Sequence, residues 1–185
     1  MTPFLWLLGF VVLQRLAELA LAQHNTRRLL AGGGREIGAR HYPLFILLHG
    51  SWLAALALAV PWSTAPSWGL VAIFLILQLL RVWVVVSLGR FWTTRIITLD
   101  NAPLIRRGPY RLLRHPNYWV VVGEIAVLPL AFGAWPIALI WSVLNALLLW
   151  HRIRIENAAL AQRRQRTPAA GPHHPDGSVA TAPRL

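Results

Sequence analysis

The sequence contains neither cysteine nor lysine. The absence of cysteine excludes disulfides, thiolate nucleophiles and cysteine-ligated metal sites. All 18 basic residues are arginine, which together with abundant alanine, glycine and proline is typical of a GC-rich genome and favours a bacterial source. Charged residues make up only 13% of the chain, whereas 56% is hydrophobic and ten residues are tryptophan. This balance is typical of a membrane protein.

The formal net charge of +12 would suggest nucleic-acid binding in a soluble protein. Here the arginines lie between apolar segments, where they set membrane orientation. We therefore expect membrane lipids, and not nucleic acid, to be the partners of this charge.

Long apolar runs predict an all-α integral membrane protein. A crossing helix needs roughly 17 to 25 predominantly apolar residues. Residues 118–150 hold about two such spans, and Gly133 and Pro136 supply a tight turn between them. We therefore predict five transmembrane helices, the last two short or tilted and forming a hairpin, near residues 3–22, 42–60, 67–88, 118–132 and 136–151.

The distribution of arginine predicts the orientation of these helices. Clusters occur in segments 23–40 and 89–117 and after residue 151, whereas the N-terminus and the other two connections carry no charged side chain. The positive-inside rule then places the N-terminus outside and the C-terminus in the cytoplasm, in a bacterial inner membrane. We treat residues 1–166 as one transmembrane domain and expect a disordered cytoplasmic tail over 167–185, where proline, alanine and glycine dominate.

Several ionisable residues lie inside the predicted spans. Such groups are costly in a membrane, so each is a candidate for a functional site. Arg15 and Glu18 are three residues apart and can form an ion pair on one helix, and an Arg81 to Glu124 pair would lock two helices together. His49 is interpreted as a hydrogen bonder in helix packing. Alternatively, these groups line a cytosol-facing cavity for a charged cofactor and a lipid tail.

The stretch "GPYRLLRHPNY", residues 108–118, precedes the fourth apolar run. Its Gly-Pro pair predicts a turn, and Pro116 disfavours helical geometry at the residue before it, so we expect a defined non-helical path. This path exposes backbone groups beside polar rings, as in the wall of a nucleotide pocket. The alternative is an interfacial aromatic belt. The side chains concerned are Tyr110, His115 and Tyr118.

A second polar stretch, "WHRIRIENAAL", begins at Trp150. Arg152 and Glu156 are four residues apart, so on a helix they share a face. One interpretation is a weak surface salt bridge. The other is a pair in which the arginine binds an anionic group and the carboxylate holds a cation, so that two oppositely charged ligands are aligned.

In this order and spacing, "GPY", "RHPNY" and "RIRIENAAL" resemble the isoprenylcysteine carboxyl methyltransferase family of integral membrane enzymes, over roughly residues 88–160. The resemblance implies an S-adenosylmethionine-dependent methyltransferase. It further implies that Arg152, as the substrate-binding residue, and Glu156 form the catalytic pair. The residues implied to bind the cofactor are Ala102, Pro103, Leu104, Ile105, Tyr110, His115, Pro116, Asn117, Tyr118 and Glu156.

Two features depart from the isoprenylcysteine pattern. Asn157 replaces the second glutamate of the last motif, and "AQRRQRTPAAG" replaces a downstream segment with Phe-Gly and tyrosine. The region from Arg15 to His49 resembles a bacterial subgroup associated with type III polyketide synthases, which methylates hydroxyl groups of alkylpyrones and phenolic lipids. The resemblance therefore implies a lipophilic or lipidated acceptor that enters from the inner leaflet, with a carboxylate or an acidic hydroxyl as the methylated group.

Arg152 is expected to hold the oxyanion of the acceptor. An acceptor that is already ionised needs no strong general base, whereas a neutral phenol would need one, with His115 or Glu156 as candidates. The alternative functions are an NADPH-dependent reductase of the sterol-reductase type, which shares an R-H-P-x-Y-like stretch, and a non-catalytic lipid-binding membrane protein.

Overall fold

A computed structural model describes residues 2–99 and 107–166, with side chains described as far as residue 158. The tail expected over 167–185 lies outside these residues. So do four of the expected cofactor contacts, namely Ala102, Pro103, Leu104 and Ile105.

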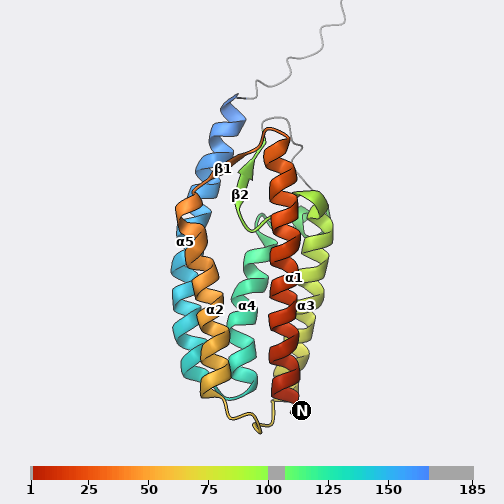
Figure 1. The fold of residues 1–185 in the computed structure, drawn as a ribbon, viewed down its shortest axis with the longest axis vertical. Helices are drawn as coiled ribbons and strands as arrows, with labels where there is room; N and C mark the ends of the chain where they lie inside the picture. Colours follow the sequence, from red (N-terminus) through yellow and green to blue (C-terminus); the bar gives the residue numbers. More distant parts are fainter. Residues whose placement is uncertain (1, 100–106, 167–185) are drawn as a thin grey trace, which may run out of the picture.

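Five helices run along the long axis of the molecule (Figure 1). The prediction of an all-α integral membrane protein is confirmed, because four of the described helices are long and apolar enough to cross a membrane. The exception is α4, whose 16 residues span only about 24 Å. The helices are α1 (Pro3–Ala31), α2 (Tyr42–Ala59), α3 (Trp68–Leu88), α4 (Pro116–Ala131) and α5 (Trp135–Arg166).

Two helices are longer than predicted. α1 continues from the expected end at residue 22 to Ala31, and α5 continues from residue 151 to Arg166. α5, which was expected to be short or tilted, has 32 residues and projects beyond the other helices in Figure 1. Hydropathy marks where a helix leaves the apolar layer, but the arginine, alanine, leucine and glutamine that follow are good helix formers and continue it.

A two-stranded antiparallel sheet, which the sequence did not predict, lies at the end of the molecule opposite the N-terminus (Figure 1). β1 (Arg35–Ile37) pairs with β2 (Ile96–Thr98), with Glu36 opposite Ile97. The glycines before β1 turn the chain back from α1, with Gly33 at φ +87°. The described residues also form three short 3-10 turns: η1 (Ala39–His41), η2 (Gly89–Phe91) and η3 (Gly108–Arg111).

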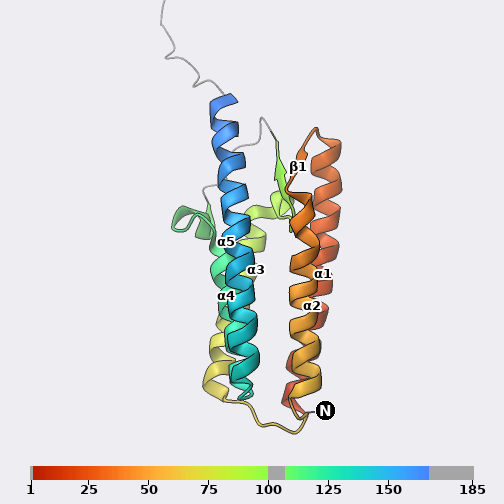
Figure 2. The same ribbon diagram turned by 90° about the vertical axis from the view of Figure 1, so that its left-hand side faces the viewer.

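The helices form two layers, with α1 and α2 on one side and α3, α4 and α5 on the other (Figure 2). The N-terminus and the uncharged connections between α2 and α3 and between α4 and α5 lie at one end, whereas the arginine-rich connections lie at the other (Figure 1). The uncharged and the arginine-rich loops thus lie at opposite ends of the molecule, as the distribution of arginine predicts. The direction of the protein in the membrane stays a prediction.

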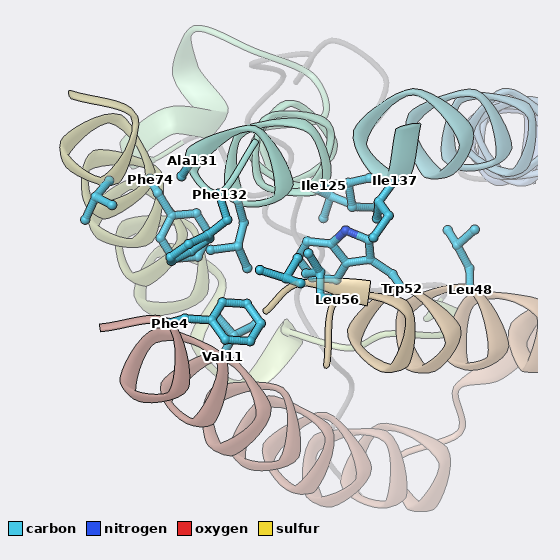
Figure 3. Close-up of a cluster of buried hydrophobic side chains, with 14 residues drawn as sticks. Phe4, Val11, Leu48, Trp52, Leu56, Phe74, Ile125, Ala131, Phe132 and Ile137 are labelled. Atoms are coloured by element: carbon cyan, nitrogen blue, oxygen red, sulfur yellow. The ribbon is translucent and has the colours of Figure 1, made fainter. Parts of the chain in front are cut away.

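Near the N-terminal end, apolar packing closes the two layers onto each other (Figure 3). Phe4 of α1 meets Phe132 edge to face at 4.9 Å, and Trp52 and Leu56 of α2 are fully buried. Ile125 of α4 belongs to the same cluster. Burial of such side chains contributes about 1.5 to 3 kcal/mol each. This core closes one end of the bundle, so that open space lies toward the sheet.

A buried ion cluster joins α1, α3 and α4. The predicted Arg15–Glu18 pair is present at 2.8 Å, and Arg81 donates from Nε to Glu124 Oε1 at 2.7 Å and makes a second bond to Oε2. Both pairing predictions are confirmed. The structure adds cross-links between them, from Arg15 to Glu124 at 2.5 Å and from Arg81 to Glu18 at 3.2 Å. Two positive and two negative charges therefore compensate each other, as burial requires.

Candidate active site

The segment before α4 is shaped by a glycine and two prolines. Gly108 has φ +56°, and a Cβ there would lie 2.1 Å from Ser87 Oγ of α3, so only glycine fits. Arg107 Nε donates to the Ser87 carbonyl oxygen at 2.7 Å and holds the segment against α3. These contacts place η3 beside the end of α3.

The predicted non-helical path over residues 108–118 is only partly correct. His115, with φ −133° and ψ 63°, is non-helical as Pro116 requires. Residues 108–111, however, form the 3-10 turn η3, and α4 already begins at Pro116. The physical reason is that the fixed φ of proline suits the first position of a helical turn, where no N–H is needed.

Tyr118 on the first turn of α4 joins the two polar residues of α5. Its hydroxyl donates to Glu156 Oε2 at 2.5 Å and accepts from Arg152 Nε at 2.9 Å. The predicted couple of Arg152 and Glu156 is therefore present on one face, but no direct ion pair joins them among the described side chains. The ring of His115 stacks on Tyr118 at 5.2 Å, and its Nδ1 lies 3.7 Å from Glu156 Oε1.

These residues line a polar cavity of about 230 Å³ between β2, η3, α4 and α5. The structure brings together six of the residues predicted for the site: Tyr110, His115, Asn117, Tyr118, Arg152 and Glu156. Pro116 does not line the cavity and is buried in the first turn of α4. Burial, and secondarily the charge of Glu156, raises the pKa of Tyr110, so this phenol stays a neutral donor at physiological pH.

Three polar atoms at this cavity are buried without a partner in the described part of the chain: His115 Nε2, Asn117 Oδ1 and Trp92 Nε1. A buried polar group without a partner costs free energy, so such atoms indicate a ligand or water. Together they offer an N–H donor, an amide acceptor and an imidazole nitrogen, beside the carboxylate of Glu156. This combination of hydrogen-bond donors and acceptors suits a ligand that carries an ammonium group, hydroxyls and a heterocycle.

A second cavity, of about 270 Å³ and mostly apolar, lies between the two helix layers. Its apolar wall comes from α1, α2, α4 and α5 and includes Leu16, Phe45, Leu53, Val121 and Leu149. The sequence reasoning missed most of this wall. Tyr42, Phe45 and His49 follow each other at intervals of three and four residues, so the helical period of α2 was the one signal that could have revealed a common face.

The two cavities meet at five residues that line both of them: Trp92, Thr93, Asn117, Tyr118 and Arg152. Arg152 is 8% exposed, and its guanidinium carbon lies 5.2 Å from the centre of the Phe45 ring and 5.9 Å from that of Tyr118. One polar and one apolar cavity thus share a wall that contains a buried cation. Trp92 and Thr93, which directly follow η2, carried no recognisable signal in the sequence.

A family profile for the isoprenylcysteine carboxyl methyltransferase (ICMT) family matches residues 70–162, which contain most of this site. The chain belongs to this family. Membership implies membrane methyltransferase activity, and ICMT family methyltransferases generally use S-adenosylmethionine. The alkylpyrone subgroup stays a prediction.

Two relatives extend the similarity beyond the family segment. The chain is 38% identical over 162 residues to the uncharacterized protein YpbQ of Bacillus subtilis. The aligned region covers 85% of this chain and 96% of the relative. The chain is also 26% identical over 153 residues to an uncharacterized protein of Haemophilus influenzae. That aligned region covers 80% of this chain and 88% of the relative. No solved structure matches the chain.

Proposed function

We propose that the ICMT family protein transfers a methyl group from S-adenosylmethionine to an oxygen of a lipophilic acceptor. The observation that carries this proposal is the shared wall of the two cavities. A polar cavity suited to a charged nucleoside and an apolar cavity suited to a lipid meet at Asn117, Tyr118 and Arg152. A two-substrate transfer between a polar and a lipid partner needs this juxtaposition.

The cofactor would be held by residues of the polar cavity. Glu156 can pair with its ammonium group, Asn117 Oδ1 and His115 Nε2 can hydrogen-bond its polar atoms, and the ring of Tyr110 can contact its base. When bound, S-adenosylmethionine supplies an electrophilic methyl group on a sulfonium. Pro116, which the resemblance implied as a cofactor contact, starts α4 and so positions Asn117 and Tyr118.

The acceptor oxygen would be held by Arg152. Its Nε is used by Tyr118, and no hydrogen bond to its terminal nitrogens occurs among the residues that the structure describes. Those nitrogens can bind a carboxylate or an ionised hydroxyl, and a charge-assisted bond is strong in such a water-poor site. Tyr118 commits its proton to Glu156, so this tyrosine orients Arg152 and does not remove the acceptor's proton.

An acceptor that arrives ionised needs alignment and no general base. We therefore propose an acidic hydroxyl, as in alkylpyrones and phenolic lipids, or a carboxylate, as in isoprenylcysteine. A neutral phenol would have to give its proton to His115 or Glu156. We place the protein in a bacterial inner membrane with its C-terminus in the cytoplasm, so that the lipid enters from the inner leaflet. Family membership supports this function over a sterol-type reductase or a non-catalytic lipid-binding protein.

Calorimetry of the purified protein in detergent tests the cofactor. We expect binding of S-adenosylmethionine and none of NADPH; binding of NADPH alone, or of neither, would contradict the proposal. The acceptor is tested by incubating the protein with methyl-labelled S-adenosylmethionine and a bacterial lipid extract, followed by mass spectrometry. The label is expected in a lipid-soluble methyl ether or methyl ester, and its absence from every lipid fraction would count against methyl transfer.

A further inference from the structure

Arg152 and Glu156 have the spacing of an ordinary ion pair on a helix. Oppositely charged side chains four residues apart lie on one face and usually pair. Among the described side chains, however, no direct bond joins these two, and the hydroxyl of Tyr118 lies between them instead. A direct pair would neutralise both the cation for the acceptor and the carboxylate for the cofactor. The function of the site therefore depends on contacts that hold the guanidinium away from Glu156.

Tyr118 provides only part of this restraint. Its hydroxyl accepts from Arg152 Nε at 2.9 Å. One hydrogen bond fixes the position of one atom of the planar guanidinium, but it does not fix the direction of the plane or of the two terminal nitrogens. A second contact is needed to keep those nitrogens at the wall that the two cavities share.

Phe45 of α2 makes this second contact. The guanidinium carbon of Arg152 lies over its ring, 5.2 Å from the ring centre. This is within the roughly 6 Å over which the negative face of an aromatic ring attracts a cation, and the attraction is stronger for a cation removed from water. Arg152 is such a cation, since it is buried. The contact also crosses between the two helix layers of Figure 2, because α2 and α5 belong to different layers.

The ring of Phe45 is itself held by a neighbouring ring. His41, four residues earlier, is buried and meets Phe45 edge to face at 6.2 Å. The same histidine meets His151 of α5 edge to face at 5.8 Å. Phe45 also lines the apolar cavity, so the ring that holds the cation is part of the wall offered to a lipid.

We propose that Phe45 is a positioning residue, which holds the guanidinium of Arg152 at the shared wall by a cation–π contact from the opposite helix layer. The inference rests on the proposed function, because Phe45 acts on methyl transfer through the acceptor-binding role of Arg152. Without the ring, the guanidinium turns toward Glu156 and the acceptor loses its cation. Phe45 lies outside residues 70–162, which the family profile matches, so α2 adds to the site a residue that this match does not contain.

Fluorinated phenylalanines at position 45 test the cation–π contact. Added fluorine atoms weaken the negative face of the ring and change its size very little. In a labelled-methyl assay at limiting bacterial lipid extract, we expect the rate to fall stepwise from phenylalanine to its mono-, di- and trifluorinated forms, by about tenfold in total. The same series at Phe4, whose ring meets that of Phe132 at 4.9 Å in the apolar core, is the control and should leave the rate unchanged. A rate that does not depend on fluorination at position 45 would overturn the proposal.

Ordinary substitutions give a second comparison. Phe45→Tyr keeps the ring and should retain the rate of methyl transfer, whereas Phe45→Leu keeps only an apolar side chain and should lower it by about tenfold. Trp150→Leu is the matched control, because it removes an exposed cation–π contact to Arg154 on α5, at 4.8 Å and outside both cavities. Equal rates for Phe45→Leu and the unmodified protein would contradict the role of the ring.

A double-variant cycle tests the contact without relying on methyl transfer. Thermal unfolding in detergent compares the full chain with Phe45→Leu, Arg152→Gln and the variant that carries both substitutions. The loss of Tm caused by Phe45→Leu should be clearly smaller when Arg152 is already replaced, because the contact is then absent. Equal losses of Tm in the two backgrounds would overturn the contact. Unequal losses, together with no methyl transfer by the unmodified protein, would support the contact and contradict the proposed function instead.

Discussion

The hydroxyl of Tyr118 donates to Oε2 of Glu156 at 2.5 Å and at the same time accepts from Nε of Arg152 at 2.9 Å. This single oxygen holds an anion-binding and a cation-binding side chain at fixed positions on adjacent turns of α5. It does so from α4, so the geometry of the site depends on the packing of two helices that are joined by a tight turn at Gly133.

Tyr118→Phe should therefore impair two functions at once. Loss of the hydroxyl removes the hydrogen bonds that Glu156 and Arg152 Nε make to it, and we expect cofactor affinity and the rate of methyl transfer each to fall by about tenfold or more. In the double variant Tyr118→Phe with Glu156→Gln, the loss of cofactor affinity should be much smaller than the sum of the losses in the two single variants, because both substitutions remove the same hydrogen bond. Calorimetry measures the affinity for S-adenosylmethionine, and a labelled-methyl assay measures the rate of methyl transfer. Additive losses would show that the two residues act independently.

Arg152→Ala should abolish methyl transfer while leaving binding of S-adenosylmethionine largely intact. The reason is that its free terminal nitrogens are assigned to the acceptor oxygen. Arg154→Ala is the matched control, since Arg154 is exposed and its guanidinium lies over the Trp150 ring at 4.8 Å. Wild-type turnover in the Arg152 variant would exclude it as the substrate-binding residue.

Glu124→Gln should destabilise the fold strongly. Glu124 is fully buried and compensates Arg15 and Arg81, so its neutralisation leaves buried positive charge and should cost about 3 to 5 kcal/mol. Glu36→Gln breaks a partly exposed pair with Arg95 and should cost at most about 1 kcal/mol. Thermal unfolding in detergent measures the stability that each of the two variants loses relative to the unmodified protein. Similar losses of stability would show that the ion cluster contributes no more than a surface pair.

Gly108→Ala should weaken cofactor binding more than Gly133→Ala. Both residues have positive φ, so both variants carry backbone strain of about 1 to 2 kcal/mol. Only at Gly108 does the new methyl also collide with Ser87, and this displaces η3 from the polar cavity. At Gly133 the methyl has no neighbour within 4 Å. Calorimetric titration with S-adenosylmethionine separates the two variants, and equal affinities would contradict the role of η3 in the site.

Features that depend on local composition were predicted from the sequence, and so was one pairing between helices, because buried charges of opposite sign must compensate each other. The apolar runs located the helices, Gly133 and Pro136 marked the hairpin, and the charge signs of Arg81 and Glu124 identified their pairing. The ends of α1 and α5 and the pairing of β1 with β2 were not predicted. A polar helix extension has no hydropathy signal, and strands of three residues carry too little pattern to be distinguished from a linker.

The sequence by itself determined that this protein has membrane-spanning helices with tight uncharged turns at one end, and which residue types lie near the opposite end. Only the tertiary structure decided that Arg15 meets Glu124 across 109 residues, and that Tyr118 joins Arg152 and Glu156 where two cavities share a wall. The physical reason is that helix formation and membrane insertion depend on local composition. Which side chains contact each other depends on how the helix layers pack, and no local sequence pattern encodes the distances between residues on different helices.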